Sequence, residues 1–266
     1  MSRGRPHVRV AAPGDSASTG SGGDVPGESP VAFLVTCEHG GNRIPPRYAA
    51  LFRGREGLLA THRGYDPGAL AMARTLARAL RATLVVSTVS RLLVELNRAP
   101  GRQFRFSPVM RDAAPAVRDD VCRRYYVPYR TEVEAIVARA VNAGRRVVHV
   151  SSHSFAPALA GAMRSADVGL LYDPLRSGER DLCHRWQAAL RARLPYWITR
   201  RNYPYLGCSD GFTTWLRQRF PERCYVGIEL EINQKHVRDR RAVPVDKQSA
   251  VAAALRDALH LSLSHP

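Results

Sequence analysis

Two histidines and two glutamates stand at or within runs of apolar residues, and such side chains can bind a metal ion and move protons. His39 and His153 each follow an apolar run, and Glu229 and Glu231 lie at positions i and i+2 of a third. Residues two apart on a strand share one face of a sheet. An open catalytic zinc site uses about three nitrogen or oxygen ligands and one water, and a carboxylate beside it can act as general base. The pattern therefore predicts a zinc site with a neighbouring base.

Each of these side chains also has a purely structural interpretation. A histidine at the end of a strand can be a hydrogen-bonded part of the fold, and Glu229 and Glu231 can pair with arginines. Asp66 can serve as the N-cap of the helix that follows it. Short motifs are weak on their own, so both interpretations stay open at this point.

The hydrophobic pattern predicts a scaffold that brings these distant segments together. Strands are expected at 31–36, 84–89, 147–150, 168–172 and 224–232, and helices at 68–81, 117–143, 178–193, 209–219 and 246–263. Asp66 and Pro67 are expected to open the first helix, with Asp66 as its N-cap. Strands that alternate with helices predict an α/β fold, a three-layer sandwich around a mostly parallel, mixed sheet. Ligands bind at the carboxyl ends of the strands in such folds, which is where the candidate residues fall.

The charge of the chain raises nucleic acid as an alternative ligand. The 266 residues carry 40 Lys and Arg against 23 Asp and Glu, a formal net charge of +17. Arginine supplies almost all of this, since only Lys235 and Lys247 are lysines, and it is scattered along the chain. Basic stretches with aromatic neighbours, at 123–126 and 200–203, are weak versions of a nucleic-acid-binding surface. We therefore expect a dispersed, solvated charge and keep a basic binding module as the more distant alternative.

Composition also indicates the domain organisation and the compartment. Residues 1–30 are rich in Gly, Ser and Pro and predict a disordered tail, followed by a single α/β domain over 31–266. The five cysteines are widely spaced and form no CxxC pair, so neither a disulfide framework nor a cysteine zinc site is expected. No apolar run approaches the ~20 residues of a membrane span, and the basic N-terminus is not followed by the apolar stretch of a secretory signal. We expect a cytoplasmic protein without a membrane partner.

Seven motifs, in this order along the chain, resemble the N-formylglutamate amidohydrolase family. They are Thr36-Cys-Glu-His39-Gly-Gly-Asn42-x-x-Pro45, His62-x-x-x-Asp66-x-Gly68-Ala69, Ser90-Arg91-x4-Leu96-Asn97-Arg98, His153-Ser154-Phe155, Val168-Gly-Leu-Leu-Tyr172, Asn202-x-Pro204-Tyr205-x-Gly207 and Ile228-Glu-Leu-Glu-Ile-Asn-Gln234. The resemblance covers about residues 33–237. It implies the fold and the type of active site found in zinc carboxypeptidases and aspartoacylase-type deacylases.

The resemblance also implies roles for individual residues. His39 and His153 would be ligands of one zinc ion, with Asp66 as the preferred third ligand and Glu38 and Asn42 as alternatives, because Asn42 stands where the related site has a glutamate. Glu231 is the preferred general base and Glu229 the alternative. Asn233 stands where the family has an arginine if Glu231 is the family glutamate. If Glu229 is that glutamate, Glu231 takes the place of the arginine. Four residues are expected to bind substrate: Arg91, Asn97, Arg98 and Tyr205.

The implied reaction is hydrolysis of the amide of a small, anionic N-acyl amino acid, with N-formylglutamate as the type substrate. Arg91 or Arg98 would stabilise the developing oxyanion, and the other would hold a substrate carboxylate. A nearer alternative is a zinc-dependent deacylase or carboxypeptidase-like hydrolase acting on another N-acyl amino acid or a peptide. A shared fold does not separate these substrates, because substrate choice is set by the pocket.

Overall fold

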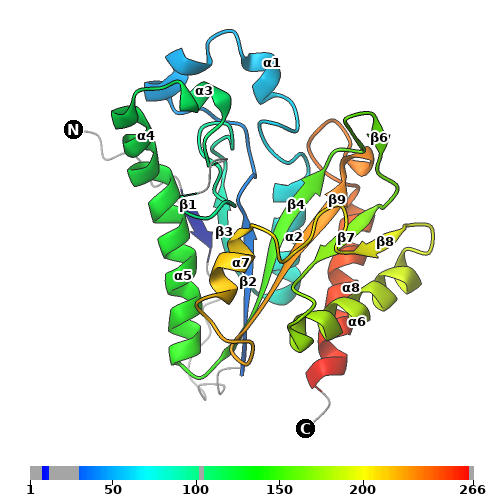
Figure 1. Ribbon diagram of the computed structural model, residues 1–266. Helices are drawn as coiled ribbons and strands as arrows, with labels where there is room; N and C mark the ends of the chain where they lie inside the picture. Colours follow the sequence, from blue (N-terminus) through cyan, green and yellow to red (C-terminus); the bar gives the residue numbers. More distant parts are fainter. Residues whose placement is uncertain (1–7, 12–29, 102–104, 264–266) are drawn as a thin grey trace, which may run out of the picture.

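A seven-stranded sheet forms the centre of the computed structural model, which describes residues 8–11, 30–101 and 105–263 (Figure 1). Its strands lie in the order β1-β3-β2-β4-β9-β7-β8. They are β1 (Val8–Ala11), β2 (Val31–Cys37), β3 (Thr83–Ser87), β4 (Arg146–Phe155), β7 (Val168–Leu171), β8 (Thr199–Arg201) and β9 (Tyr225–Asn233). A separate hairpin pairs β5 (Ala158–Leu159) with β6 (Ala162–Met163).

The sheet is mixed and mostly parallel, as the sequence predicts. Strands β3, β2, β4 and β9 run parallel to one another, and β7 and β8 form a further parallel pair. Two antiparallel pairings complete the sheet, between β1 and β3 and between β7 and β9. The central pair is the longest: β4 and β9 are in register from Val147 opposite Tyr225 to Phe155 opposite Asn233. This register places His153 directly opposite Glu231.

Helices cover both faces of the sheet and complete the three layers (Figure 1). One face carries α2 (Ala69–Leu80), α6 (Ser177–Arg193) and α8 (Val245–Leu263), and the other carries α5 (Val127–Asn142) and α7 (Phe212–Arg217). Each face has its own apolar core, with Trp186 fully buried in the first and Tyr129 fully buried in the second. Burial of apolar side chains on two faces explains why β2 is apolar along nearly its whole length, while β4 and β9 carry polar residues toward their carboxyl ends.

Short elements connect these layers. They are the 3-10 helices η1 (Pro46–Phe52) and η4 (Gln234–His236), the helices α1 (Glu56–Leu59), α3 (Pro108–Arg111) and α4 (Pro115–Val121), and a π-helical segment over Cys122–Tyr126. The π-helical segment joins α4 to α5, so the helix expected at 117–143 runs over 115–142 and is less regular than predicted. Within the described residues, no helix has the length and apolarity needed to cross a membrane.

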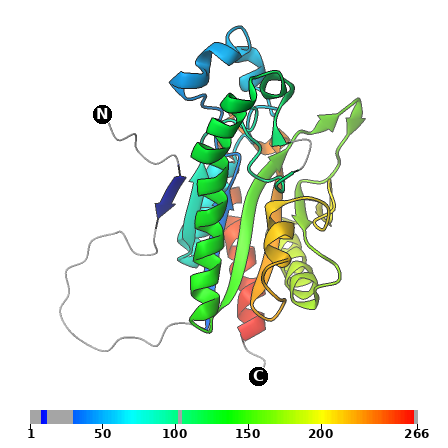
Figure 2. The same ribbon diagram turned by 60° about the vertical axis from the view of Figure 1, so that its left-hand side comes forward.

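Several local expectations differ from the structure, and the helix expected at 209–219 forms only over Phe212–Arg217. Val8–Ala11, inside the predicted tail, form the edge strand β1 because β3 offers a free edge for antiparallel pairing (Figure 2); the rest of that tail, apart from Pro30, lies outside the described residues. Strand β4 continues five residues beyond the expected end at 150, because β9 pairs with it from Val147 to Phe155. Asp66 is not the N-cap of α2: Gly68 holds that position, with φ of +82°, and no side chain caps the helix.

Candidate active site

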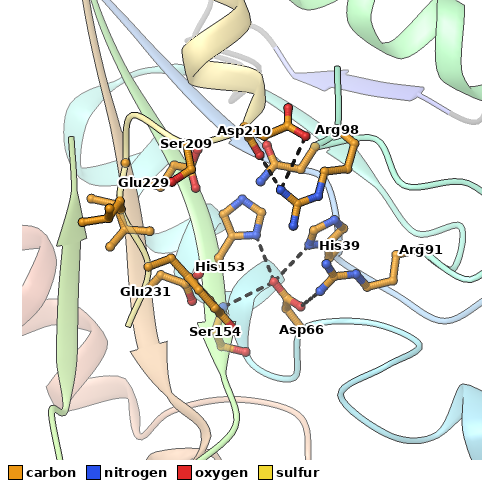
Figure 3. A pocket seen from close by; sticks show the side chains of 16 residues that line it. His39, Asp66, Arg91, Arg98, His153, Ser154, Ser209, Asp210, Glu229 and Glu231 are labelled. Carbon is orange, nitrogen blue, oxygen red and sulfur yellow. Dashed lines mark hydrogen bonds and ion pairs between the residues drawn. The ribbon is translucent and has the colours of Figure 1, made fainter. Parts of the chain in front are cut away.

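A pocket of about 310 Å³ opens where β2 and β4 end, and its lining includes His39, Asp66 and His153 (Figure 3). His39 lies two residues after β2, in a turn made possible by two glycines. A Cβ at Gly40 would lie 2.9 Å from the carbonyl oxygen of Ser87, and one at Gly41 would lie 2.7 Å from that of Thr88. The backbone of Gly40 donates a hydrogen bond of 3.0 Å to Ser87. The turn after His39 is thereby held against the end of β3.

The side chains of His39, Asp66 and His153 converge on one point and could hold a metal ion. Each offers one ligand atom, and the three atoms lie within 4.8 Å of one another, with all three residues buried. Oδ2 of Asp66 is 3.1 Å from Nδ1 of His39 and 2.9 Å from Nδ1 of His153. Two imidazoles and a carboxylate are a ligand set used by catalytic zinc sites.

The far nitrogen of each imidazole is held by another buried carboxylate or hydroxyl. Nε2 of His39 forms a short hydrogen bond with Oε1 of Glu95. Nε2 of His153 lies 2.9 Å from Oγ of Ser151 and 3.4 Å from Oε2 of Glu38. Histidine ligands of metal ions commonly donate their second ring N–H to such a partner, which fixes the tautomer and the ring orientation. The geometry thus presents Nδ1 of both rings toward Asp66 and suits a metal ion at this point.

The electrostatics of this group are dominated by its burial and its opposite charges. Burial lowers the pKa of His153, but the adjacent carboxylates of Asp66 and Glu38 outweigh it and hold that pKa well above its usual value. Burial raises the pKa of Asp66, but the charge of His39 and the hydrogen bonds from both imidazoles outweigh it and bring that pKa well below its usual range. Burial likewise works against ionisation of Glu38, and the contacts with His153 and Ser151 lower its pKa to about 2.

The two glutamates of β9 line the same pocket but have different surroundings. Oε1 of Glu229 accepts a hydrogen bond of 2.7 Å from Oγ1 of Thr213. Oε2 of Glu231 is buried and has no hydrogen-bond partner among the described residues. Burial raises the pKa of Glu231 to about 8, with His153 acting in the opposite direction. Of the two carboxylates, Glu231 is the one opposite His153 in the sheet and the one with proton-accepting capacity to spare.

The two candidate substrate-binding arginines also differ. Nε and Nη2 of Arg91 contact Oε2 of Glu95 at 2.8 and 2.6 Å, and Nη1 contacts Oδ1 of Asp66 at 3.1 Å. Arg98 is anchored through Nη1 to the carbonyl oxygen of Asp210 at 2.6 Å, and its side chain is 38% exposed. Both line the pocket. Arg91 thus contacts the two carboxylates that also contact His39, while Arg98 lies at the rim of the pocket.

The remaining predicted site residues lie at the pocket or beside it. Asn97 lines the pocket, and its Oδ1 accepts a hydrogen bond of 2.6 Å from the backbone of Phe212. Tyr205 lines it as well and accepts a hydrogen bond from Arg164. Asn42, one alternative ligand, instead donates to the carbonyl of Leu59 at 3.2 Å.

Glu38, the other alternative ligand, lies on the Nε2 side of His153, away from the point where the Nδ1 atoms meet. Asn233 is fully buried and donates to the carbonyl oxygens of Arg164 and Ala166. Glu95 is the supporting residue that the sequence analysis did not assign to the site. Its position between Arg91 and Asn97 in one motif is the signal that could have found it.

The fold and this group of side chains describe an α/β protein with a buried His-Asp-His cluster suited to a metal ion. The family model of N-formylglutamate amidohydrolase matches residues 31–237. The chain belongs to the N-formylglutamate amidohydrolase family, as the motifs of the sequence indicate.

Solved structures show the same fold. A gene product of Agrobacterium tumefaciens is 29% identical, with a TM-score of 0.75, over 98% of this chain and 96% of that one. An N-formylglutamate amidohydrolase from Ralstonia eutropha JMP134 is 20% identical, with a TM-score of 0.65, over 98% of this chain and all of that one. No curated protein sequence is a significant match.

Proposed function

We propose that this protein hydrolyses the amide bond of a small N-acyl amino acid, with a formyl group as the acyl group, and that it uses one zinc ion. One observation carries the proposal: in a member of the N-formylglutamate amidohydrolase family, the buried His39–Asp66–His153 group and the free carboxylate of Glu231 line one pocket. A metal site beside an unpartnered base is the arrangement that amide hydrolysis by water requires.

The zinc ion would be held by Nδ1 of His39, Nδ1 of His153 and Oδ2 of Asp66. When bound, it polarises the scissile carbonyl and makes water more acidic. The chain contributes the rigidity of this site. Glu95 and Arg91 support His39, while Ser151 and Glu38 support His153, so that both rings keep their lone pairs directed at one point.

Glu231 would act as the general base and then as the general acid. Its carboxylate takes a proton from the water that attacks the acyl carbon, and the carbonyl oxygen gains negative charge. Glu231 then gives the proton to the nitrogen as the C–N bond breaks, which releases formate and the amino acid. Burial raises the pKa of Glu231, which makes its carboxylate a stronger base toward the attacking water, and the positive charge of a bound metal ion would favour the ionised form that takes the proton. Arg91 supplies a fixed positive charge near the developing oxyanion.

Arg98 would bind the α-carboxylate of the substrate, with Asn97 and Tyr205 beside it. Its guanidinium is partly exposed at the pocket, and Nη1 is already oriented by Asp210. A planar guanidinium is well suited to hold a carboxylate through two parallel hydrogen bonds. The amino acid is thereby oriented with its acylated nitrogen toward the metal group and Glu231.

Metal analysis combined with a formate-release assay on N-formyl amino acids tests this proposal. We expect about one zinc ion per chain, formate release by the wild type, and loss of both properties in His153→Ala. His184→Ala is the matched control, because His184 is exposed on α6, away from the pocket. A protein that binds no zinc, or a His153→Ala variant with full activity, would contradict the proposal. Release of other acyl groups in place of formate would keep the mechanism and assign a different substrate.

A further inference from the structure

The charges on the pocket wall restrict which amino acid can be bound. All three nitrogen positions of the Arg91 guanidinium already contact carboxylates, Nε and Nη2 with Glu95 and Nη1 with Asp66. A guanidinium committed to two internal carboxylates is a poor partner for a third one from a ligand. Arg98, the other arginine among the described residues that line the pocket, is less committed: Nη1 contacts the carbonyl oxygen of Asp210 at 2.6 Å and its carboxylate at 3.7 Å, and the described residues place no carboxylate on Nε or Nη2, which remain for a substrate carboxylate. The pocket therefore offers one arginine, Arg98, to bind one carboxylate of the substrate.

A second carboxylate would face Glu229. The Glu229 side chain is 7% exposed and lines the pocket, and the described residues give it one hydrogen-bond donor, Oγ1 of Thr213. The loop that packs on it has a glycine at the point of contact: a Cβ at Gly211 would collide with Oε1 of Glu229. The neighbours of Glu229 therefore hold its carboxylate in the pocket wall. Among the described residues that line the pocket, no arginine contacts this carboxylate directly, so its negative charge is not neutralised there.

The position of Glu229 matches that of a substrate side chain. Glu229 and Glu231 are two residues apart on β9, which corresponds to about 7 Å along a strand. Figure 3 shows Glu229 and Arg98 on opposite sides of His153. An amino acid with its acylated nitrogen beside Glu231 and its α-carboxylate on Arg98 would direct its side chain across the pocket, toward the wall that Glu229 forms.

We propose that Glu229 determines the side-chain specificity of this protein and selects amino acids with a cationic, lysine-like or arginine-like side chain over glutamate. The inference rests on the proposed function for the placement of the substrate, and it assigns the substrate class of the same site. A buried carboxylate attracts an ammonium or guanidinium group and repels a second carboxylate, and both effects are strong where water is largely excluded. Glutamine, which is neutral and carries N–H donors, should fall between the two.

Binding of the free amino acids, the products of the reaction, tests the inference without turnover. Calorimetry on the zinc-loaded protein compares lysine, glutamine and glutamate for the wild type, for Glu229→Gln and for the control Glu132→Gln. Glutamine at position 229 preserves size and can still accept the hydrogen bond from Thr213. Glu132 is a partly exposed carboxylate on α5 that pairs with Arg139 at 3.5 Å, so its substitution makes the same change of charge away from the pocket.

We expect the wild type to bind lysine at least about tenfold more tightly than glutamate, and Glu229→Gln to reduce that ratio by about tenfold, as is typical of one close charge pair. Glu132→Gln should keep the wild-type ratio. Glutamate binding to the wild type as tightly as lysine, an unchanged ratio in Glu229→Gln, or no binding of any of the three would overturn the inference. The order in which the wild type binds lysine, glutamine and glutamate tests the inference even if a variant does not fold.

Formate release from the three N-formyl derivatives separates this inference from the proposed function. If none is hydrolysed while the binding preference for lysine persists, the proposed reaction is wrong and the specificity of the pocket stands. If all are hydrolysed and N-formylglutamate is the best substrate, the reaction stands and the role of Glu229 is wrong.

Discussion

Replacement of Glu95 by glutamine should weaken zinc binding, although Glu95 itself is not one of the proposed ligands. In the structure, Oε1 of Glu95 accepts from Nε2 of His39 and from the backbone of Asn97, and Oε2 accepts from Arg91. The amide oxygen of glutamine can replace Oε1. Its NH₂ group then faces the N–H groups of Arg91, which lose their acceptor. The ring of His39 loses a charged partner, and Arg91 loses its bidentate contact.

The size of the effect follows from the bonds that change. A hydrogen bond to a charged group contributes about 1.5–3 kcal/mol and a neutral one about 0.5–1.5 kcal/mol, so the change at His39 alone weakens the support by about 1–1.5 kcal/mol. Replacement of such supporting residues in metal sites commonly lowers metal affinity about 10–100-fold. That range equals about 1.4–2.7 kcal/mol. We therefore expect zinc to bind between about ten and one hundred times more weakly in Glu95→Gln.

Competition with a chromophoric chelator measures the zinc dissociation constants of the wild type, Glu95→Gln and the partly exposed control Glu132→Gln. Urea unfolding in the presence of EDTA reports the fold of each apoprotein separately, so a loss of affinity can be distinguished from a loss of structure. Zinc affinity within twofold of the wild type in a folded Glu95→Gln protein would refute the reasoning, because His39 would then need no charged support to act as a ligand.

Three further predictions concern the base, a buried histidine and a buried ion pair. Glu231→Gln should lower kcat by about 10²–10⁴-fold with zinc affinity retained, and a fully active variant would exclude Glu231 as the base. His149 is buried between Thr36 and Tyr225, and burial lowers its pKa to about 4 from 6.5. Because the pKa of His149 is lower in the folded than in the unfolded protein, its contribution to the free energy of unfolding is complete above pH 6.5 and is lost as the pH falls. At pH 4 the free energy of unfolding should be lower by about 3 kcal/mol for this reason. Urea titrations from pH 7 to 4 should show that loss in the wild type and not in His149→Gln; equal losses would contradict it. Arg217→Met should destabilise the fold by about 3–5 kcal/mol, because it leaves Glu179 buried without the partner now at 2.9 Å. Adding Glu179→Gln should restore part of the stability, and no recovery in urea unfolding would count against the ion pair as the cause.

Much of the scaffold could be predicted because its signals are local. The apolar run at 31–36 becomes β2, and the run at 224–232 becomes β9 shifted by one residue. Helix α6 begins one residue before the expected start and ends where predicted, at Arg193. The pattern of apolar residues predicts both strands that are buried on two faces and amphipathic helices. The two edge strands β1 and β8, which the sequence did not predict, and the full length of β4 depend on partner strands and needed the assembled sheet.

For the candidate site, the sequence predicts residues that the structure brings together, but it does not predict most of the contacts between them. The sequence indicates that His39 and His153 belong together, but the local pattern Asp66-Pro67-Gly68 suggests a helix cap for Asp66. In the structure, Gly68 takes that position and frees the Asp66 carboxylate to meet both imidazoles. Nothing local to Glu95 indicates that it contacts His39. The choice between Glu229 and Glu231 likewise depends on Thr213, which is distant in sequence from both.

The sequence by itself determined the α/β architecture, the family and the pair of histidines, because apolar periodicity and ordered motifs are properties of neighbouring residues. The tertiary structure alone decided which groups touch. His39 meets Asp66 across 27 residues and Glu95 across 56, and His153 meets Asp66 across 87. Such contacts arise only when the sheet is assembled and its loops are packed, since they depend on strand order and register. The same assembly places Glu229 and Glu231 in different surroundings on one strand: one carboxylate accepts a hydrogen bond from Thr213, and one oxygen of the other is buried without a hydrogen-bond partner among the described residues.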